Sequence, residues 1–456
     1  MKKKKIFNYI SLISKKLNYK TYLIGGYVRN YLLNKKKSLD IDIVTTGNSI
    51  KLAKYFSKKI LTKKIFFFKR FKTAIVKYKD YNIEFVSTRK EYYNIYNNKP
   101  TVKIYKSIIE DQNRRDFTIN SIAISLNIKN YGKIIDTFNG LKDLKKKKIR
   151  TPLNPNITFY DDPLRMIRAI RFSSQLNFKL NKKLKKAIIE NIDRIRIISI
   201  ERIIQEFNKI LLSKKPSIGL KLMFNLGFLS IILPELIPFK NKFKNYFIKN
   251  IFIKILKLLD NIKTNNLWLK WAILLQYVGK PICKKYIKKK KKWNFKLYEI
   301  VSYNMIPKIF IRLKLPMNKK MKYVQNIIKY SNFFIKILKK KEKKYIIKKI
   351  FLKLNNKIIK DIIKLCYNNI IVNNKKNIKI KFKKLLLIIK KIKKKKIKIN
   401  INGNDIKNIL NIKTSKRVGI IKNKIIKLII KNNLKNNYKC IYKKIIDINN
   451  NLNGKK

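Results

Sequence analysis

The sequence predicts an α/β head followed by an all-α neck, body and tail. Up to about residue 150, short runs of β-branched and aromatic residues alternate with helical patterns, which is typical of a mixed sheet with helices. Beyond about residue 155 the pattern becomes helical almost without a break, and Pro152 and Pro155 mark the change. We place the head, neck, body and tail at residues 1–152, 153–215, 216–330 and 331–456.

The composition indicates a folded protein with a polyanionic partner. The 456 residues are 46% hydrophobic, which is ample for several packed cores. Lys and Arg total 115 against 23 Asp and Glu, and the formal net charge of +92 favours nucleic acid as a partner. Because Lys, Ile and Asn dominate everywhere, as in proteins from very AT-rich genomes, the charge near the motifs is more informative than the total.

The histidine and cysteine content limits the kinds of metal site and catalysis that the protein can have. The chain contains no histidine, and Cys283, Cys366 and Cys440 form no Cys-x-x-Cys pair. This pattern excludes the usual zinc sites and histidine-based acid–base catalysis, and it argues for a reducing compartment.

Two apolar stretches are not expected to enter a membrane. The N-terminus up to Ile13 imitates a signal peptide, but Lys15 and Lys16 interrupt it and no small-residue cleavage site follows. We therefore expect an amphipathic first helix. The stretch Leu222–Leu233 is shorter than the ~20 residues that a membrane-spanning helix needs. The expectation is a cytoplasmic protein without membrane association.

The first part of the head is expected to contain five strands and two helices after the first helix. The helices are predicted at Tyr27–Leu33 and Asn48–Ser57. Runs rich in β-branched and aromatic residues predict strands at Tyr22–Ile24, Asp40–Thr45, Ile65–Phe68, Thr73–Tyr78 and Asn82–Val86.

A glycine pair separates the first strand from the helix that follows it. Gly25 and Gly26 have no Cβ, so the backbone there can turn tightly and present its N–H groups. Arg29 lies in the first turn of the helix, beside the helix N-terminus, where anions bind favourably. These three residues predict a cradle for phosphate.

Two carboxylates follow on the next strand. In Leu39–Val44 the apolar residues alternate with Asp40 and Asp42, so both carboxylates lie on one face and Ile41 and Ile43 on the other. Two carboxylates beside a phosphate cradle predict Mg²⁺ chemistry on a nucleotide.

The order of these motifs resembles a known family. Gly-Gly-x-Val-Arg on a strand-to-helix turn, then Asp-x-Asp on the next strand, resembles the catalytic motif of the polymerase-β-type nucleotidyltransferases. The resemblance is greatest to the class II branch, the CCA-adding tRNA nucleotidyltransferases and bacterial poly(A) polymerases. It implies a third carboxylate, for which Glu84 is the candidate, and two metal ions held by Asp40, Asp42 and Glu84. It also implies that the polar, irregular segment Glu91–Ile109 is a flexible loop beside the active site.

A second motif follows in the head. Arg114–Thr118 reads Arg-Arg-Asp-Phe-Thr and is expected to open a helix. Alone, it would fit an ordinary solvated helix start. After the first motif it is similar to a signature of the family, which implies that Arg115 lies near the triphosphate or ribose and that Asp116 accepts from the ribose 2′-hydroxyl.

A third motif predicts the choice of nucleotide. Asp162 precedes Pro163, which predicts a helix capped by Asp162, with Arg165 and Arg168 on the same side. An ion pair at a helix start would fit this pattern too. The donors of Arg165 match O2 and N3 of cytosine or N1 of adenine, and the Asp162 carboxylate matches the exocyclic amino group of both bases. The motif is similar to the family's Glu-Asp-x-x-Arg, with Asp161 in place of Glu. The resemblance makes Asp162 and Arg165 the base-selecting pair, with Arg168 as a further nucleotide-binding candidate.

The body resembles an HD phosphohydrolase domain that has lost its metal site. Leu267–Pro281 is similar to the core helix of such a domain, but Gln276 and Tyr277 stand where His-Asp is expected. Without histidine that metal cluster cannot form, so we expect a degenerate, helical scaffold. Beyond about residue 330, Lys- and Ile-rich amphipathic helices form a basic tail that is expected to bind tRNA.

Together the motifs predict a member of the CCA-adding tRNA nucleotidyltransferases. The resemblance implies addition of CCA to the acceptor arm of tRNA from CTP and ATP, with Mg²⁺ as the cofactor. The alternatives are a bacterial-type poly(A) polymerase, an enzyme that adds only CC or only A, and a non-catalytic RNA-binding relic. The sequence leaves the oligomeric state open.

Overall fold

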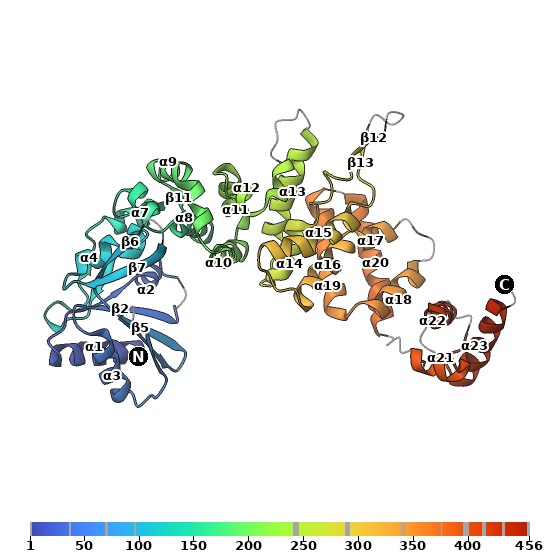
Figure 1. Cartoon of the computed structure of the whole chain (residues 1–456), viewed down its shortest axis with the longest axis horizontal. Coiled ribbons are helices and arrows are strands. Elements are labelled where there is room, and N and C mark those ends of the chain that lie inside the picture. Colours follow the sequence, from blue (N-terminus) through green and yellow to red (C-terminus); the bar gives the residue numbers. More distant parts are fainter. Residues whose placement is uncertain are drawn as a thin grey trace. The chain divides into compact units, whose positions relative to one another are not determined.

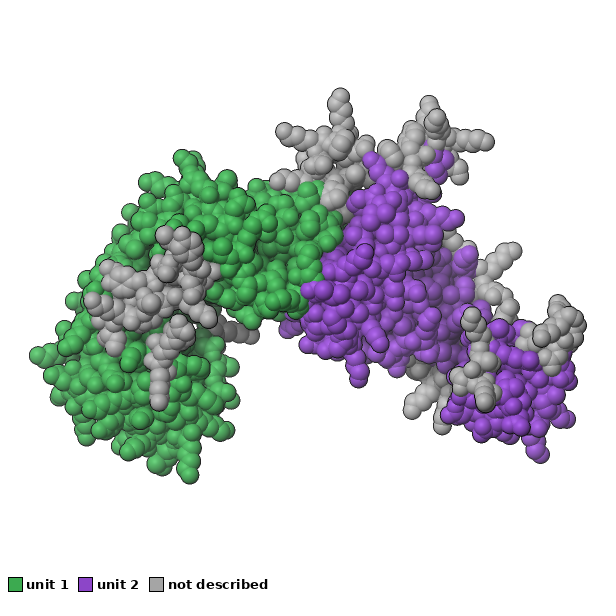
Figure 2. Space-filling view, viewed as in Figure 1, with its two compact units in different colours: residues 1–260, 312–314 green, residues 261–311, 315–456 purple. Residues whose placement is uncertain are grey.

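The computed structural model describes residues 2–35, 38–68, 72–94, 97–239, 246–287, 292–338, 340, 343–374, 376–394, 401–412, 416–430 and 434–453. They form two compact units, one of residues 1–260 and 312–314 and the other of residues 261–311 and 315–456 (Figure 2). The boundaries given above for head, neck, body and tail stay predictions.

A seven-stranded mixed sheet lies at the centre of the first unit (Figure 1). Its order is β3-β4-β5-β2-β1-β8-β9; β2 and β5 run parallel, and the other neighbours are antiparallel. The five predicted strands are confirmed to within one residue, whereas β8 and β9 are too short to give a sequence pattern. The strands span Thr21–Ile24 (β1), Asp40–Thr45 (β2), Ile65–Phe68 (β3), Thr73–Tyr78 (β4), Tyr81–Ser87 (β5), Ala123–Ser125 (β8) and Ile134–Ile135 (β9).

Helix α3 covers one face of this sheet. Phe56 of α3 packs against Phe85 of β5, with ring centroids 5.5 Å apart. Because successive strand residues alternate between faces, the neighbouring Glu84 points to the other face. The helices of the head are α1 (Lys2–Lys16), α2 (Gly26–Leu32), α3 (Ser49–Lys59), α4 (Ile108–Asn113), α5 (Thr118–Ser121) and α6 (Gly140–Lys145).

The N-terminal segment forms the expected amphipathic helix. Ile6 and Ile10 of α1 are buried, while its last turn carries Lys15 and Lys16. Among the residues that the structure describes, none of the helices is long and apolar enough to span a membrane.

The prediction that Glu91–Ile109 is irregular is wrong. Arg89–Asn94 (β6) and Asn97–Ile104 (β7) form an antiparallel pair, and Ile108 begins α4. The backbone groups of two polar segments can pair with each other without the apolar alternation by which a half-buried strand is recognised.

The rest of the first unit is helical, as predicted. Two-residue strands β10 (Lys148–Ile149) and β11 (Lys179–Leu180) pair in parallel beside these helices. Helix α8 is central, and its Met166, Ile167 and Ile170 are fully buried. The helices are α7 (Pro155–Asp161), α8 (Leu164–Leu176), α9 (Lys182–Asn191), η3 (Ile192–Ile197), α10 (Ile200–Leu211), α11 (Pro216–Asn225), α12 (Phe228–Ile232), η4 (Pro234–Phe239) and α13 (Tyr246–Asn261).

The second unit is also helical, apart from the short antiparallel pair β12 (Lys285–Ile287) and β13 (Lys292–Asn294). Gln276 and Tyr277 are buried in its core, where the Tyr277 hydroxyl donates to Oδ1 of Asn369 at 3.2 Å. The likeness of this region to an HD domain stays a prediction. Its helices are α14 (Leu267–Leu275), α15 (Tyr298–Arg312), α16 (Lys319–Lys329), α17 (Phe333–Ile337), α18 (Lys343–Lys353), α19 (Asn356–Val372), α20 (Lys376–Lys394), α21 (Gly403–Leu410), α22 (Lys416–Ile430) and α23 (Tyr438–Asn453).

Candidate active site

The carboxylates predicted to bind metal lie on adjacent strands. Asp42 of β2 is the direct cross-strand partner of Glu84 on β5, so their side chains share one face of the sheet. Asp40 lies two residues before Asp42 on the same face, and its Oδ1 accepts a hydrogen bond from Nδ2 of Asn82 at 2.9 Å. The structure therefore brings the three carboxylates to one face, the one that α3 does not cover.

The surroundings of Asp42 and Glu84 disfavour the negative charge of their carboxylates. Burial raises the pKa of Asp42, and the charge of Asp40 raises it further, against the opposing effect of Arg115. Burial also raises the pKa of Glu84, with an additional contribution from Asp42. A bound cation would offset this repulsion.

The glycine turn approaches Asp42 closely. Gly25 has φ 78° and ψ −144°, a conformation that is essentially restricted to glycine, and the backbone N–H of Gly26 donates to the Asp42 carboxylate. A Cβ at Gly25 would lie 2.5 Å from Oδ2 of Asp42 and 3.3 Å from Nη1 of Arg115. The absence of a side chain at Gly25 thus allows the turn, the carboxylate and the guanidinium to meet.

Replacing Gly25 with alanine is expected to abolish activity and to destabilise the head by about 1–3 kcal/mol, the usual cost of a strained backbone position. Gly132→Ala is the matched control, since Gly132 also has a positive φ of 84° but has no atom within 4 Å of the place that a Cβ would take. It should lose stability and keep activity. Thermal unfolding and the nucleotide incorporation that the sequence motifs predict, both measured for the two variants, distinguish backbone strain from displacement of Asp42.

A buried aspartate that the sequence analysis did not single out orients the Arg-Arg pair. Asp111 of α4 accepts from Nε of Arg114 at 2.8 Å and from Nε of Arg115 at 3.1 Å. Burial alone would raise the pKa of Asp111, but the two guanidinium groups outweigh burial and lower it. The sequence does contain a signal for this contact: Asp111 precedes Arg114 by three residues and Arg115 by four. Side chains at these spacings are neighbours on a helix.

Asp116 is held in a second network. Its Oδ1 accepts from the backbone N–H of Phe117 and from Nδ2 of Asn120, both at 2.9 Å, and its Oδ2 forms an ion pair with Arg168 at 2.6 Å. Oδ1 of Asn120 accepts in turn from Nη1 of Arg29 at 2.7 Å. No sequence pattern indicated the role of Asn120, because the network joins α2, α5 and α8, which are far apart in the chain.

Arg29 faces α5 and α8 as well as the glycine turn. Its Cζ lies 5.0 Å from the ring centroid of Phe172, and its Nη2 lies 3.7 Å from the position of a Cβ at Gly26. Burial lowers the pKa of Arg29, partly offset by the charge of Asp116. This buried guanidinium links the turn to the Asp116 network.

The predicted helix start at Asp162 is displaced. Asp161 ends α7, Asp162 has an extended backbone (φ −138°, ψ 95°), and α8 begins at Leu164. The first backbone N–H after Pro163 belongs to Leu164, and Oδ1 of Asp162 accepts from it at 3.2 Å. The prediction that Asp162 is the N-cap is wrong by one residue, because Pro163 takes the N-cap position and Asp162 lies just before it. The first turn is closed by bonds between residues three apart, from Arg165 N–H to the Asp162 carbonyl and from Met166 N–H to the Pro163 carbonyl, so the regular helix begins at Leu164.

Arg165 and Arg168 both reach the segment of the Arg-Arg-Asp motif. Arg165 is 8% exposed, and its Nη2 donates to the carbonyl of Arg114 at 2.8 Å. Asp162 lies within electrostatic range of Arg168 and contributes to the raised pKa of that guanidinium. Arg168 thus belongs to the Asp116 network, and Arg165 contacts the neighbouring backbone, whereas Oδ1 of Asp162 lies 3.9 Å from Nη2 of Arg202.

Parts of the chain match known protein families. Residues 21–150 match the family described as the poly A polymerase head domain, and residues 177–240 match the probable RNA and SrmB-binding site of polymerase A. The chain is 36% identical over 256 residues to the CCA-adding enzyme of Pediococcus pentosaceus, covering 56% of this chain and 60% of that protein. Residues 21–150 and 177–240 thus carry the head domain and the probable RNA-binding segment of the poly(A) polymerase families.

The A-adding tRNA nucleotidyltransferase of Aquifex aeolicus is also similar, with 43% identity over 169 residues, which cover 37% of this chain and 20% of that protein. The chain thus matches 20% and 60% of the length of these two relatives. A solved CCA-adding enzyme in complex with ATP has the same fold, with a TM-score of 0.68 and 23% identity over 98% of this chain and 95% of that one. The Thermotoga maritima CCA-adding enzyme complexed with tRNA gives a TM-score of 0.63 at 23% identity, over 97% and 95% of the two chains.

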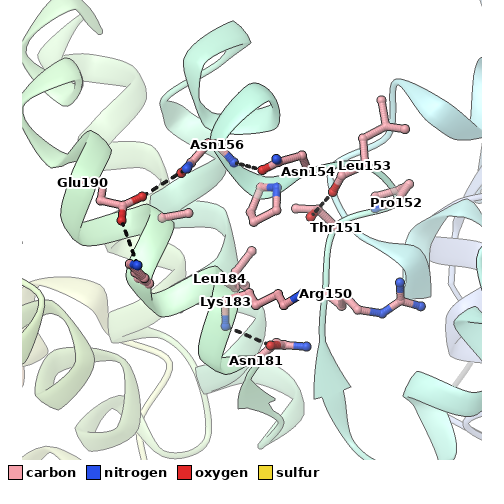
Figure 3. A pocket seen from close by; sticks show the side chains of 13 residues that line it. Arg150, Thr151, Pro152, Leu153, Asn154, Asn156, Asn181, Lys183, Leu184 and Glu190 are labelled. Carbon is pink, nitrogen blue, oxygen red and sulfur yellow. Dashed lines mark hydrogen bonds and ion pairs between the residues drawn. The ribbon is translucent and has the colours of Figure 1, made fainter.

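A separate cavity of about 510 Å³ lies between the segment before α7 and helix α9 (Figure 3). Nδ2 of Asn156 donates to Glu190 across it at 3.0 Å, and Asn181 caps α9 by accepting from the backbone N–H of Lys183. None of the site residues predicted for this family lines the cavity. This cavity is therefore not part of the candidate active site.

The Asp116–Arg168 ion pair is expected to make the stability of the protein depend on pH. The pKa of Asp116 is lowered from 3.8 to about 2 in the fold, where burial is outweighed by Arg168. A lowered pKa contributes stability above about pH 4 that is lost as the pH falls toward 2, and the shift corresponds to about 2 kcal/mol. Asp116→Asn should remove this contribution at neutral pH, and the free energy of unfolding of the variant should fall less steeply as the pH is lowered.

Urea unfolding of the wild type and Asp116→Asn at neutral and acid pH measures this difference. Asp193→Asn is the control, because Asp193 is exposed and its distance to Arg196 is 3.9 Å. Equal losses of stability in both variants would contradict the role of the buried pair.

Proposed function

We propose that this chain adds CCA to the 3′ end of tRNA, using CTP and ATP. The observation that carries the proposal is the cross-strand pair Asp42–Glu84 beside the Gly25 turn and Arg115, within a matched poly A polymerase head domain. This set can bring a polyphosphate and a hydroxyl nucleophile together at one face of the sheet, the arrangement that nucleotidyl transfer needs.

The carboxylates fit Mg²⁺. The donor set consists only of oxygens, and burial and mutual repulsion raise the pKa of Asp42 and Glu84. Among the described residues, no group of three His, Cys, Asp or Glu side chains is arranged to hold a metal ion by itself. Mg²⁺ usually takes one or two protein carboxylates together with water and substrate phosphates, so Asp40, Asp42 and Glu84 suffice with a bound nucleotide. Two such ions would activate the 3′-hydroxyl of the RNA and neutralise the leaving pyrophosphate.

The residues around the carboxylates are proposed to bind different parts of the nucleotide. Arg115, oriented by Asp111, offers its guanidinium to the triphosphate over the Gly25 turn. Asp116 is the candidate acceptor for the ribose 2′-hydroxyl, and its low pKa keeps it an ionised acceptor at neutral pH.

Base selection is assigned to Asp162 and Arg165. The bond from Arg165 to the carbonyl of Arg114 fixes the guanidinium relative to the triphosphate-binding segment. Cytosine and adenine both offer an exocyclic amino group to Asp162 and a ring acceptor to Arg165, whereas guanine and uracil offer the reverse pattern. A fixed pair can therefore accept C and A and reject G and U.

The proposed partner is the acceptor arm of tRNA. The net charge of +92, the match of residues 177–240 to a probable RNA-binding site, and the fold shared with an enzyme solved with tRNA support this partner. An enzyme that adds only A is the second candidate, because the Aquifex aeolicus relative bears that name. Poly(A) polymerase activity is less favoured, since the relatives described above are CCA-adding or A-adding enzymes.

Single-nucleotide incorporation tests the proposal. Three tRNA primers, ending before CCA, after the first C and after the second C, are each incubated with one NTP and Mg²⁺. A CCA-adding enzyme extends the first two with CTP and the third with ATP, and an A-adding enzyme extends only the third. Extension of every primer by a long A tail, or of none, would refute CCA addition.

A further inference from the structure

A row of paired residues crosses the sheet from the carboxylates to its edge. Asp42 on β2 pairs with Glu84 on β5, and Glu84 also pairs with Ile75 on β4. Ile75 pairs with Phe66 on the edge strand β3. Directly paired residues point to the same face of a sheet, so Phe66 lies on the carboxylate face, two strand spacings or roughly 10 Å from Glu84.

This end of the carboxylate face exposes aromatic surface. Phe66 is 49% exposed and Phe68, two residues along the same face, is 47% exposed. Ile75, between Phe66 and Glu84, is partly buried and continues the apolar surface toward the carboxylates. Contiguous exposed apolar surface beside a reactive centre indicates a binding surface.

A lysine lies beside one of the exposed rings, within a basic segment of the chain. Nζ of Lys77, on β4, lies 5.4 Å from the ring centroid of Phe66. Residues 43–79 contain 11 Lys and Arg and no Asp or Glu. Aromatic side chains interleaved with cations are the pattern that binds unpaired nucleic acid, because bases stack on the rings while the cations attract the phosphates.

The strand order separates this surface from the triphosphate side. Gly25 follows β1, which neighbours β2 on one side, and β5 neighbours β2 on the other. The Gly25 turn and Phe66 therefore lie on opposite sides of Asp42. If the triphosphate lies over Gly25 and Arg115, the surface around Phe66 is left for the strand that supplies the 3′-hydroxyl.

We propose that Phe66, with Ile75 and Lys77, forms a stacking platform for an unpaired base of the RNA strand whose 3′ end reaches the carboxylates. The inference rests on the proposed function, because it assigns the path of the RNA in that reaction. The aromatic ring takes the base, Lys77 attracts the adjoining phosphate, and the apolar side chain of Ile75 continues the contact toward Glu84.

The edge strand provides its own control. Phe67 is 40% exposed but points to the opposite face, where Nζ of Lys54 on α3 lies 5.6 Å from its ring centroid. Phe66→Ala and Phe67→Ala thus remove the same ring from the same strand at similar exposure. Only the first change alters the carboxylate face.

Binding of a short single-stranded RNA that carries 2-aminopurine, without NTP or Mg²⁺, tests the platform. Phe66→Ala should weaken binding about 5- to 150-fold, the effect of losing one base–aromatic stack, and should relieve the fluorescence quenching. Phe67→Ala should bind like the wild type, and Phe66→Tyr should retain both binding and quenching. Equal binding by Phe66→Ala and Phe67→Ala would overturn the proposal.

Steady-state kinetics with tRNA primer distinguish the occupant. Phe66→Ala should raise KM for tRNA and leave KM for the nucleotide unchanged. A rise in KM for the nucleotide alone would place the nucleotide on Phe66 and overturn the proposal. The binding assay contains no NTP. RNA binding that does not depend on Phe66 therefore refutes the platform alone, whereas a product other than CCA refutes the proposed function alone.

Discussion

Replacing Asp42 with asparagine is expected to lower the rate of nucleotide addition by at least ~1000-fold, since metal stabilisation contributes several kcal/mol and each ~1.4 kcal/mol is a factor of ten. Asp42 is the carboxylate with Asp40 beside it, Glu84 opposite it and the Gly26 N–H bonded to it. Asparagine keeps the size and one acceptor oxygen, so the turn at Gly25 retains its neighbour.

The same substitution should leave the head folded. Burial raises the pKa of Asp42, which means that its ionised form costs stability in the protein without metal. Removing the charge should therefore leave Tm unchanged or raise it. Single-turnover incorporation and thermal unfolding measure the two effects, with Asp80→Asn as a control because Asp80 is exposed in the turn after β4. Activity close to the wild type in Asp42→Asn would contradict the metal assignment.

Replacing Arg165 with alanine is expected to reduce the preference for CTP and ATP over GTP and UTP about 100-fold, the effect of losing roughly 3 kcal/mol of hydrogen bonding to a charged group. Arg165 is buried and anchored to the carbonyl of Arg114, so its guanidinium is held in place before the nucleotide binds. Lysine should not restore the preference, because an ammonium group lacks the planar pair of donors.

Competition among the four NTPs on one primer, read by sequencing the added nucleotide, measures this selectivity. Arg196→Ala is the control: Arg196 is exposed and forms only a long ion pair with Asp193 at 3.9 Å among the contacts described for it. Unchanged nucleotide preference in Arg165→Ala would remove α8 from base selection.

The elements of the head could be predicted because their patterns are local. Apolar residues alternate with Asp40 and Asp42, and glycines mark the turn before α2, so strand, turn and helix follow from short windows. The pair β6–β7 was missed because polar strands leave no such alternation. The start of α8 was misplaced by one residue because its first turn is closed by bonds between residues three apart, a detail of backbone hydrogen bonding that no sequence pattern encodes.

Contacts between segments that are far apart in the chain could not be predicted from the sequence. Glu84 was a candidate only by resemblance, and its direct pairing with Asp42 depends on a parallel strand register that no local pattern encodes. The bridging role of Asn120 depends on the meeting of α2, α5 and α8. Likewise Phe66 was part of a predicted strand, but its place on the carboxylate face became visible only with the register of four strands.

CCA addition by this chain is tested most simply by incubating the purified protein with Mg²⁺, all four NTPs and tRNA lacking its 3′ end, and sequencing the products. We expect a discrete C-C-A end, because the proposed base-selecting residues Asp162 and Arg165 would admit only C and A and the bound tRNA would limit the length. A long A tail, a mixed sequence or no addition would show that the chain does not add CCA.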